Sequence, residues 1–221
     1  CSESGYAGRL DKLAAASSLF DPVITERTQA ILDAVKARGD AAVLELTKRF
    51  DGAELTVEQL GVSTAEFMSA ALQSDDEFRA AMDLASRNIA LFARRSMRRD
   101  WSVKNAQGAT VGEKFDPYQR VGVYIPGGTA PLASTCLMTI LLARVAGCPE
   151  IVVCTPCNAE GRINAQLLHA ARAAGATEVY RVGGAQAVAA MALGTATIRP
   201  VQKVFGPGNA YVVAAKRLLF G

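Results

Sequence analysis

The residues best suited to bind a ligand lie in three glycine-bearing turns, each of which follows an expected β-strand. The turns are Tyr124 to Gly128, Val182 to Gln186 and Phe205 to Asn209. Glycine lets backbone amides approach a ligand closely, and helices that begin at Ala185 and Asn209 offer free N–H groups and partial positive charge to a phosphate. Any one of these motifs alone is more typical of an ordinary tight turn. Three of them on one edge of a sheet favour a nucleotide-binding site.

None of the three turns matches the dinucleotide fingerprint G-x-G-x-x-G. The sequence also has no Asp after Asp116, and the expected strand that ends at Cys154 lacks a following acidic residue to hold a ribose hydroxyl. A standard Rossmann NAD site is therefore not supported. If a dinucleotide binds here, uncharged polar groups such as Tyr124, Gln186 and Asn209 must orient it.

Other reactive residue types give weaker patterns. Cys154 and Cys157 have the spacing of a redox pair, but the residues that follow look like continued loop rather than the helix N-terminus that would activate a thiol. The only histidine, His169, falls in the middle of an expected helix with no acidic or Cys partner at i+3 or i+4, which favours a structural or surface role. One histidine nearly excludes a His-based metal site within a single chain, and no G-x-S-x-G motif is present. We therefore assign no catalytic residue and no metal ligand.

The elements that must position the glycine turns alternate after residue 120 between strand, turn and helix. The expected strands are Arg120 to Ile125, Glu150 to Cys154, Val179 to Val182 and Val201 to Phe205, and the expected helices are Leu132 to Ala146, Leu167 to Ala174, Ala185 to Leu193 and one that starts at Asn209. This alternation predicts an α/β fold with a parallel sheet and helices on both faces. Ligands of such sheets bind at the carboxyl ends of the strands.

The first 120 residues have a different pattern, which is helical and rich in charge. Apolar periodicity predicts helices over Thr25 to Arg38, Ala41 to Phe50 and Asp76 to Arg98. A hairpin is expected between Trp101 and Asp116, with its turn near residues 105–108. We expect two regions: residues 1–120, a helical region with the first part of a split α/β domain, and residues 121–221, an NAD-binding-like α/β domain.

Composition narrows the class of protein. The chain has 221 residues, of which 50% are hydrophobic and 20% charged, and no apolar run is long enough to span a membrane. Residues 1–5 lack the basic start and apolar stretch of a secretory signal, so a cytoplasmic location is expected, and the start at Cys rather than Met suggests a trimmed chain. Five cysteines, mostly in apolar runs, make disulfides unexpected.

The charge is unevenly distributed between the two regions. Residues 1–120 carry 16 basic and 18 acidic groups, and residues 121–221 carry 8 basic and 3 acidic groups. A net charge of +5 in the second region suits an anionic ligand such as a phosphate-bearing cofactor. Because Lys and Arg are not clustered, nucleic acid is not an expected partner, and because no apolar run could span a membrane, a membrane is not expected either.

Several segments closely resemble the histidinol dehydrogenase family. They are Val121 to Gly128, Leu137 to Thr139, Ala143 to Gly147, Glu150 to Pro156, Val182 to Ala187 and Gly206 to Val212, and Val35 to Phe50 and Asn88-Ile89 with Phe92 are similar to the family's early helices. The resemblance implies an incomplete Rossmann-like, aldehyde-dehydrogenase-like sheet. It also implies a zinc- and NAD-dependent homodimer that oxidises L-histidinol to L-histidine in histidine biosynthesis. The family holds NAD with a Tyr, a Gln and an Asn, which match Tyr124, Gln186 and Asn209.

Length is the main departure from the family, whose members are roughly twice as long and carry their zinc ligands and catalytic base beyond the position that matches Gly221. The resemblance therefore implies an N-terminal portion that is inactive alone. Two alternatives remain open: a non-catalytic folded module for dimerisation or binding, and a fragment of a related NAD-dependent alcohol dehydrogenase.

Overall fold

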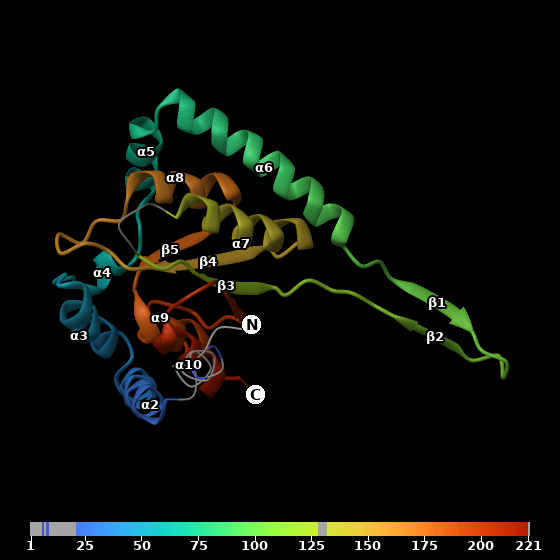
Figure 1. Cartoon of the computed structure of the whole chain (residues 1–221), viewed down its shortest axis with the longest axis horizontal. Helices are drawn as coiled ribbons and strands as arrows, with labels where there is room; N and C mark the ends of the chain where they lie inside the picture. The colour runs from blue at the N-terminus through green and yellow to red at the C-terminus, as the bar shows by residue number, and fades with distance from the viewer. Residues whose placement is uncertain (1–5, 7, 9–20, 128–131, 221) are drawn as a thin grey trace.

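A four-stranded sheet with helices on both faces forms the body of the protein (Figure 1). The computed structural model describes residues 6, 8, 21–127 and 132–220. Gly128 of the first glycine turn and residues 1–5, in which no signal segment was found, lie outside the described residues. No described helix is long and apolar enough to cross a membrane.

The sheet is parallel throughout, in the strand order β5-β4-β3-β6. Its strands are β3 (Arg120–Tyr124), β4 (Glu150–Thr155), β5 (Glu178–Arg181) and β6 (Lys203–Phe205). Because all four strands run in one direction, the turns that follow β3, β5 and β6 lie on the same edge. The α/β class, the parallel sheet and the placement of the three turns are confirmed.

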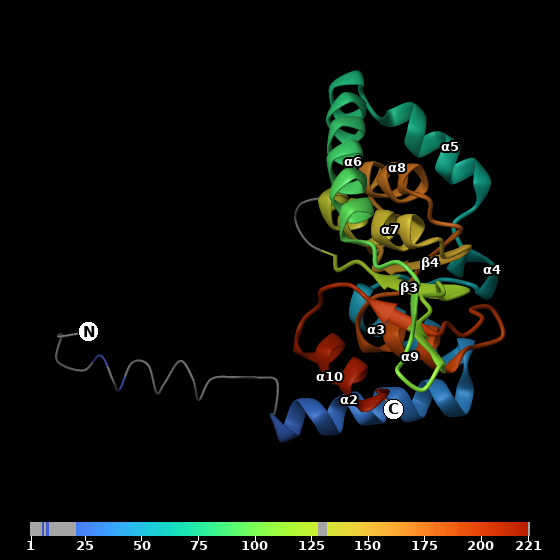
Figure 2. The ribbon, with the colours of Figure 1, turned by 90° about the vertical axis from the view of Figure 1, so that its right-hand side faces the viewer.

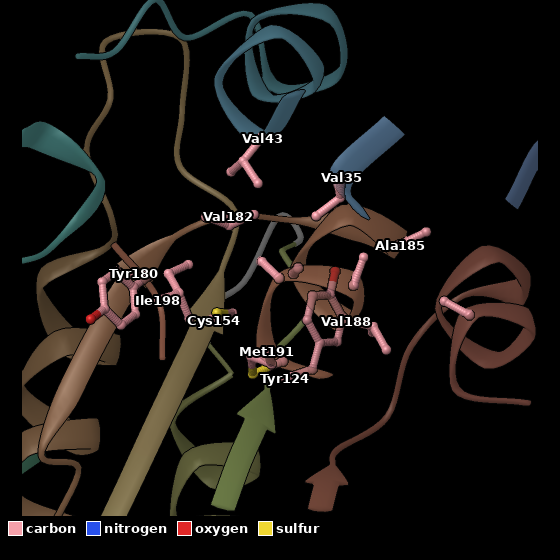
Figure 3. Close-up of a cluster of buried hydrophobic side chains, with 14 of the residues drawn as sticks. Val35, Val43, Tyr124, Cys154, Tyr180, Val182, Ala185, Val188, Met191 and Ile198 are labelled. Carbon is pink, nitrogen blue, oxygen red and sulfur yellow. The ribbon is translucent and has the colours of Figure 1, made fainter. Parts of the chain in front are cut away.

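Two hydrophobic cores lie on opposite faces of the sheet because side chains alternate along each strand. Val121 and Val123 of β3 face the core under α7 (Ala133–Ala146) and α8 (Ala165–Ala174). Tyr124 faces the other core, under α9 (Gly184–Leu193) and α10 (Ala210–Leu218). Figure 3 shows side chains of this second core, where Tyr124 lies beside Val188 and Met191 of α9.

Helices from the first part of the chain cover both of these layers (Figures 1 and 2). They are α2 (Pro22–Arg38), α3 (Asp40–Asp51), α4 (Val57–Leu60), α5 (Thr64–Gln73) and α6 (Asp76–Ser96). α2 packs on α9 and α10, whereas α5 packs on α8 and α6 packs on α7. The N-terminal helices therefore form the outer layer on each side of the sheet.

Helices α4 and α5 were not among the expected elements, although each begins with a capping box. In α5 the Ser63 side chain accepts from the Glu66 amide, and the Glu66 carboxylate accepts from the Ser63 amide. The guanidinium of Arg181 holds this segment to the sheet: it donates to the carbonyls of Gln59, Gly61 and Gly161 and pairs with Glu66.

Some expected element ends were wrong by a few residues, for local reasons. β6 begins at Lys203 rather than Val201, because the Val201 amide donates to the carbonyl of Met191 in α9. α8 begins at Ala165 rather than Leu167, because Asn164 caps its first amides. α6 ends at Ser96 rather than Arg98.

The expected hairpin is confirmed, and it forms an arm that extends away from the body (Figure 1). β1 (Trp101–Lys104) pairs antiparallel with β2 (Thr110–Glu113), and every residue of both strands is exposed. A two-stranded hairpin exposed on both faces is only marginally stable in water.

Candidate functional site

A cleft of about 1180 Å³ opens at the carboxyl edge of the sheet, between the strand ends and helices α2 and α3. Tyr124, Gln186 and Asn209 all line it, although they come from three different turns. A smaller hollow of about 640 Å³ lies beyond Pro126 and Pro156, next to α5 and α8.

Tyr124 is the last residue of β3, and its ring is buried, with 3% of its surface exposed. Its hydroxyl oxygen accepts a hydrogen bond of 3.0 Å from the amide of Gly184 at the start of α9. Burial raises the pKa of this phenol, so the group stays protonated near neutral pH. The O–H of Tyr124 is therefore available as a donor.

Gln186 lies in the first turn of α9 and is 1% exposed. Neither its Nε2 nor its Oε1 has a hydrogen-bond partner within the described part of the chain. A β-carbon at Gly184, whose φ is +64°, would lie 2.7 Å from this Oε1, so glycine is required for the amide to sit here. An unpaired buried amide costs stability, which marks Gln186 as a group preorganised for a ligand.

Asn209 caps α10: its Oδ1 accepts from the amide of Val212 at 3.1 Å. This bond holds the side chain so that its amide nitrogen remains free to donate. The turn before it is held in place by Lys216, whose Nζ donates to the carbonyl of Gly206 at 2.6 Å. A β-carbon at Gly206 would lie 2.0 Å from the Tyr124 carbonyl, so only glycine lets this turn approach β3.

The opposite wall of the cleft contains charged residues that the sequence analysis did not identify. Arg27 of α2 and Tyr211 of α10 line this wall together, and Arg38 and Arg49 also line the cleft. Asp51, the last residue of α3, has its Oδ2 buried without a hydrogen-bond partner among the described residues. Burial raises the pKa of Asp51 from its usual value to about 6.

A signal for Asp51 was present in the sequence. An acidic residue in the last turn of a helix faces the negative end of the helix dipole, and such locally unfavourable choices occur at functional sites. For the arginines no comparable signal existed, because α2 and α3 reach the glycine turns only through tertiary packing.

The cysteine pair and His169 take no part in this cleft as nucleophiles. Burial raises the pKa of Cys157 to about 11 and that of the fully buried Cys154 further, so both stay thiols near neutral pH. His169 lies on α8, on the other face of the sheet, with its ring 6.0 Å from that of Phe78.

The family-implied zinc ion does not fit the residues present. Within residues 21–127 and 132–220, no group of three or more His, Cys, Asp or Glu side chains is placed to hold a metal. The polar groups of the cleft, Tyr124, Gln186 and Asn209, can donate and accept hydrogen bonds to a ligand.

Comparison with known proteins decides the family. A family model described as histidinol dehydrogenase matches residues 16–221. The chain belongs to the histidinol dehydrogenase family. It is 48% identical to a histidinol dehydrogenase of Symbiobacterium thermophilum. The match extends over 202 residues, which are 91% of this chain and 46% of that relative. The corresponding protein of Rhizobium meliloti is 47% identical, covering 87% of this chain and 44% of the relative.

Solved structures agree with the sequence relatives. The crystal structure of histidinol dehydrogenase from Elizabethkingia anophelis superposes with a TM-score of 0.84 at 37% identity, covering 88% of this chain and 44% of that one. The chain thus spans about half the length of the histidinol dehydrogenases it matches.

Proposed function

We propose that this chain is the N-terminal portion of an L-histidinol dehydrogenase. In histidine biosynthesis this enzyme catalyses the NAD-dependent oxidation of L-histidinol to L-histidine. Its part in that reaction is to bind the dinucleotide. The observation that carries this proposal is the buried, unpaired amide of Gln186 at the start of α9, in one cleft with Tyr124 and Asn209.

The three side chains would bind and orient the cofactor. Tyr124 donates its O–H, Asn209 donates its amide N–H, and Gln186 can both donate and accept. The first turns of α9 and α10 present amides and partial positive charge, which suit the pyrophosphate. When bound, NAD supplies the acceptor for hydride from the alcohol carbon.

The remaining machinery would come from polypeptide outside this chain. We infer that the zinc ligands belong there, because the described residues hold no group of three or more His, Cys, Asp or Glu side chains placed for a metal, and the resemblance implies that the base belongs there too. The chain alone would then bind NAD without oxidising histidinol. We also propose that the whole protein is a cytoplasmic homodimer, as the resemblance implies.

Titration with NAD tests the binding role. We expect Gln186→Ala and Asn209→Ala each to weaken NAD binding about tenfold, the effect of losing one or two hydrogen bonds in a buried site. Isothermal titration calorimetry or saturation-transfer NMR would measure it, with Gln29→Ala on the exposed side of α2 as a matched control. Equal affinity in parent and both variants would contradict the assignment, and NADH formation from histidinol by the chain with zinc would contradict its inactivity.

A second function is favoured by a separate observation, the exposed apolar side chains of α6 and the hairpin arm. Phe92, Trp101 and Val103 are all exposed. Apolar surface of this kind marks protein–protein contacts, so the chain would also serve as an assembly module.

A further inference from the structure

Asp51 lies where the dinucleotide cleft meets the start of α9. A β-carbon at Gly183, the N-cap of α9, would lie 3.2 Å from the Asp51 Oδ2. Asp51 lines the same cleft as Tyr124, the last residue of β3, and Cys157, which follows β4. Asp51 thus faces the same space as the three polar residues of the glycine turns.

An ionised carboxylate only accepts hydrogen bonds, and its Oδ2 has no donor among the described side chains and amides. A ligand group that donates would relieve that cost. A phosphate placed at the same point would instead bring two anions together, which is strongly unfavourable at a buried site. A ligand group that binds beside Asp51 would therefore be a hydrogen-bond donor without negative charge.

The phosphates have a better position elsewhere in the cleft. Arg27 lines the cleft together with Tyr211, which lies in the first turn of α10, so its cation is on the side of that helix's positive end. Asn209, which caps the same helix, lies on this side too. Asp51 therefore lies beside the start of α9, whereas Arg27 and Asn209 lie on the side of the start of α10.

We propose that Asp51 binds the cofactor directly, accepting hydrogen bonds from a hydroxyl pair or amide of the dinucleotide, while the pyrophosphate lies on the α10 side beside Arg27. This inference rests on the proposed NAD-binding function. It gives Asp51 the role of the acidic residue that is missing after the second strand of the sheet.

NAD affinity of the full chain, measured by calorimetry, tests the proposal. We expect Asp51→Asn to weaken NAD binding about 10- to 100-fold, since hydrogen bonds to a charged acceptor are the stronger ones. Glu45→Gln is the matched control, because Glu45 lines the same cleft and its loss changes the net charge equally, but it already pairs with Arg38. Asp51→Ser provides a second variant of smaller volume.

The pH dependence gives an independent readout. Binding by the parent should weaken about fivefold as pH falls below about 6, where the carboxyl is protonated, and Asp51→Asn should not share that decline. Burial raises the pKa of Tyr124 and of Cys157, so neither of these neighbours loses its proton in this range, and the other charged groups that line the cleft are Arg27, Arg38, Arg49 and Glu45. His169 lies on the other face of the sheet and is the same in parent and variant.

Fragments of the cofactor separate the two sources of a donor. A loss of affinity confined to nicotinamide mononucleotide assigns Asp51 to the nicotinamide half, and one confined to AMP assigns it to the adenosine half. Either result supports the proposal. The role of Asp51 is refuted if Asp51→Asn binds NAD as tightly as the parent and with the same pH profile. In that case Gln186→Ala still tests the proposed NAD site. A parent that binds no NAD overturns both.

Discussion

Asp51 illustrates how a single residue can be unfavourable for the fold and favourable for a ligand. Its carboxylate is half-buried at the end of α3, so desolvation disfavours its charge and raises its pKa. The folded state therefore binds a proton at Asp51 more tightly than the unfolded state does. The residue stabilises the fold when protonated, and this contribution is lost when the carboxyl ionises.

Stability of an Asp51→Asn variant should show this cost directly. The contribution is fully present below about pH 4 and is lost as pH rises through about 6, so the variant should exceed the parent in free energy of unfolding at neutral pH by about 1 kcal/mol, discounted for partial exposure. At pH 3.5 the two should agree, by the same linkage. Urea unfolding at both pH values measures the difference. Asp83→Asn on the exposed side of α6 is the control, and a variant less stable than the parent at neutral pH would refute the argument.

At the scale of elements, the sequence predicted the sheet because its signals are local. Each strand of the body is a short apolar run, three of the four are followed by a glycine-bearing turn, and each crossover helix is an apolar stretch of ordinary length, so the types of the elements along the chain followed from periodicity. The glycine turns met on one edge for the same reason: parallel strands all end on one side. The sequence alone therefore placed Tyr124, Gln186 and Asn209 at one edge of the sheet.

Elements that depend on tertiary contacts were harder to predict. The segment of α4 and α5 is short and is held by side chains from far along the chain, above all by Arg181. Helices α2 and α3 form a wall of the cleft because they pack on α9. No local sequence pattern predicts this packing. The division at residue 120 stays a prediction.

Replacement of Arg181 tests how the α4–α5 segment is held. Its side chain is 6% exposed and satisfies three backbone carbonyls, so Arg181→Lys, which keeps the charge but loses the planar fork of donors, should destabilise the protein by about 2–4 kcal/mol. Amide exchange in α4 and α5 should accelerate more than exchange in β3 and β4. Arg162→Lys, in an exposed pair with Glu160, should change the unfolding free energy by at most about 0.5 kcal/mol. Uniform acceleration throughout the chain would show that Arg181 has no special role in holding this segment.

At the scale of the whole molecule, the body and the arm differ in how complete they are. The body buries two cores against a sheet covered on both faces, whereas the hairpin arm and the outer side of α6 have no covering layer within the described structure. The relatives are about twice as long, so further polypeptide or a second copy is available to cover these surfaces. Composition alone did not reveal this, because exposed and buried apolar residues look the same in a count.

Association of the chain in solution is the consequence that can be measured. We expect the parent to sediment above the monomer mass at micromolar concentration, and Phe92→Glu combined with Val103→Lys to shift it to monomer without changing the far-ultraviolet circular dichroism, because both side chains are exposed and contribute little to the cores. Leu72→Glu on α5 is the control: it removes an exposed apolar side chain from a different helix, and its sedimentation should match the parent's. If the parent is strictly monomeric, the arm has no role in self-association. Its apolar residues would then be assigned to intramolecular contacts with the further polypeptide that the longer relatives contain.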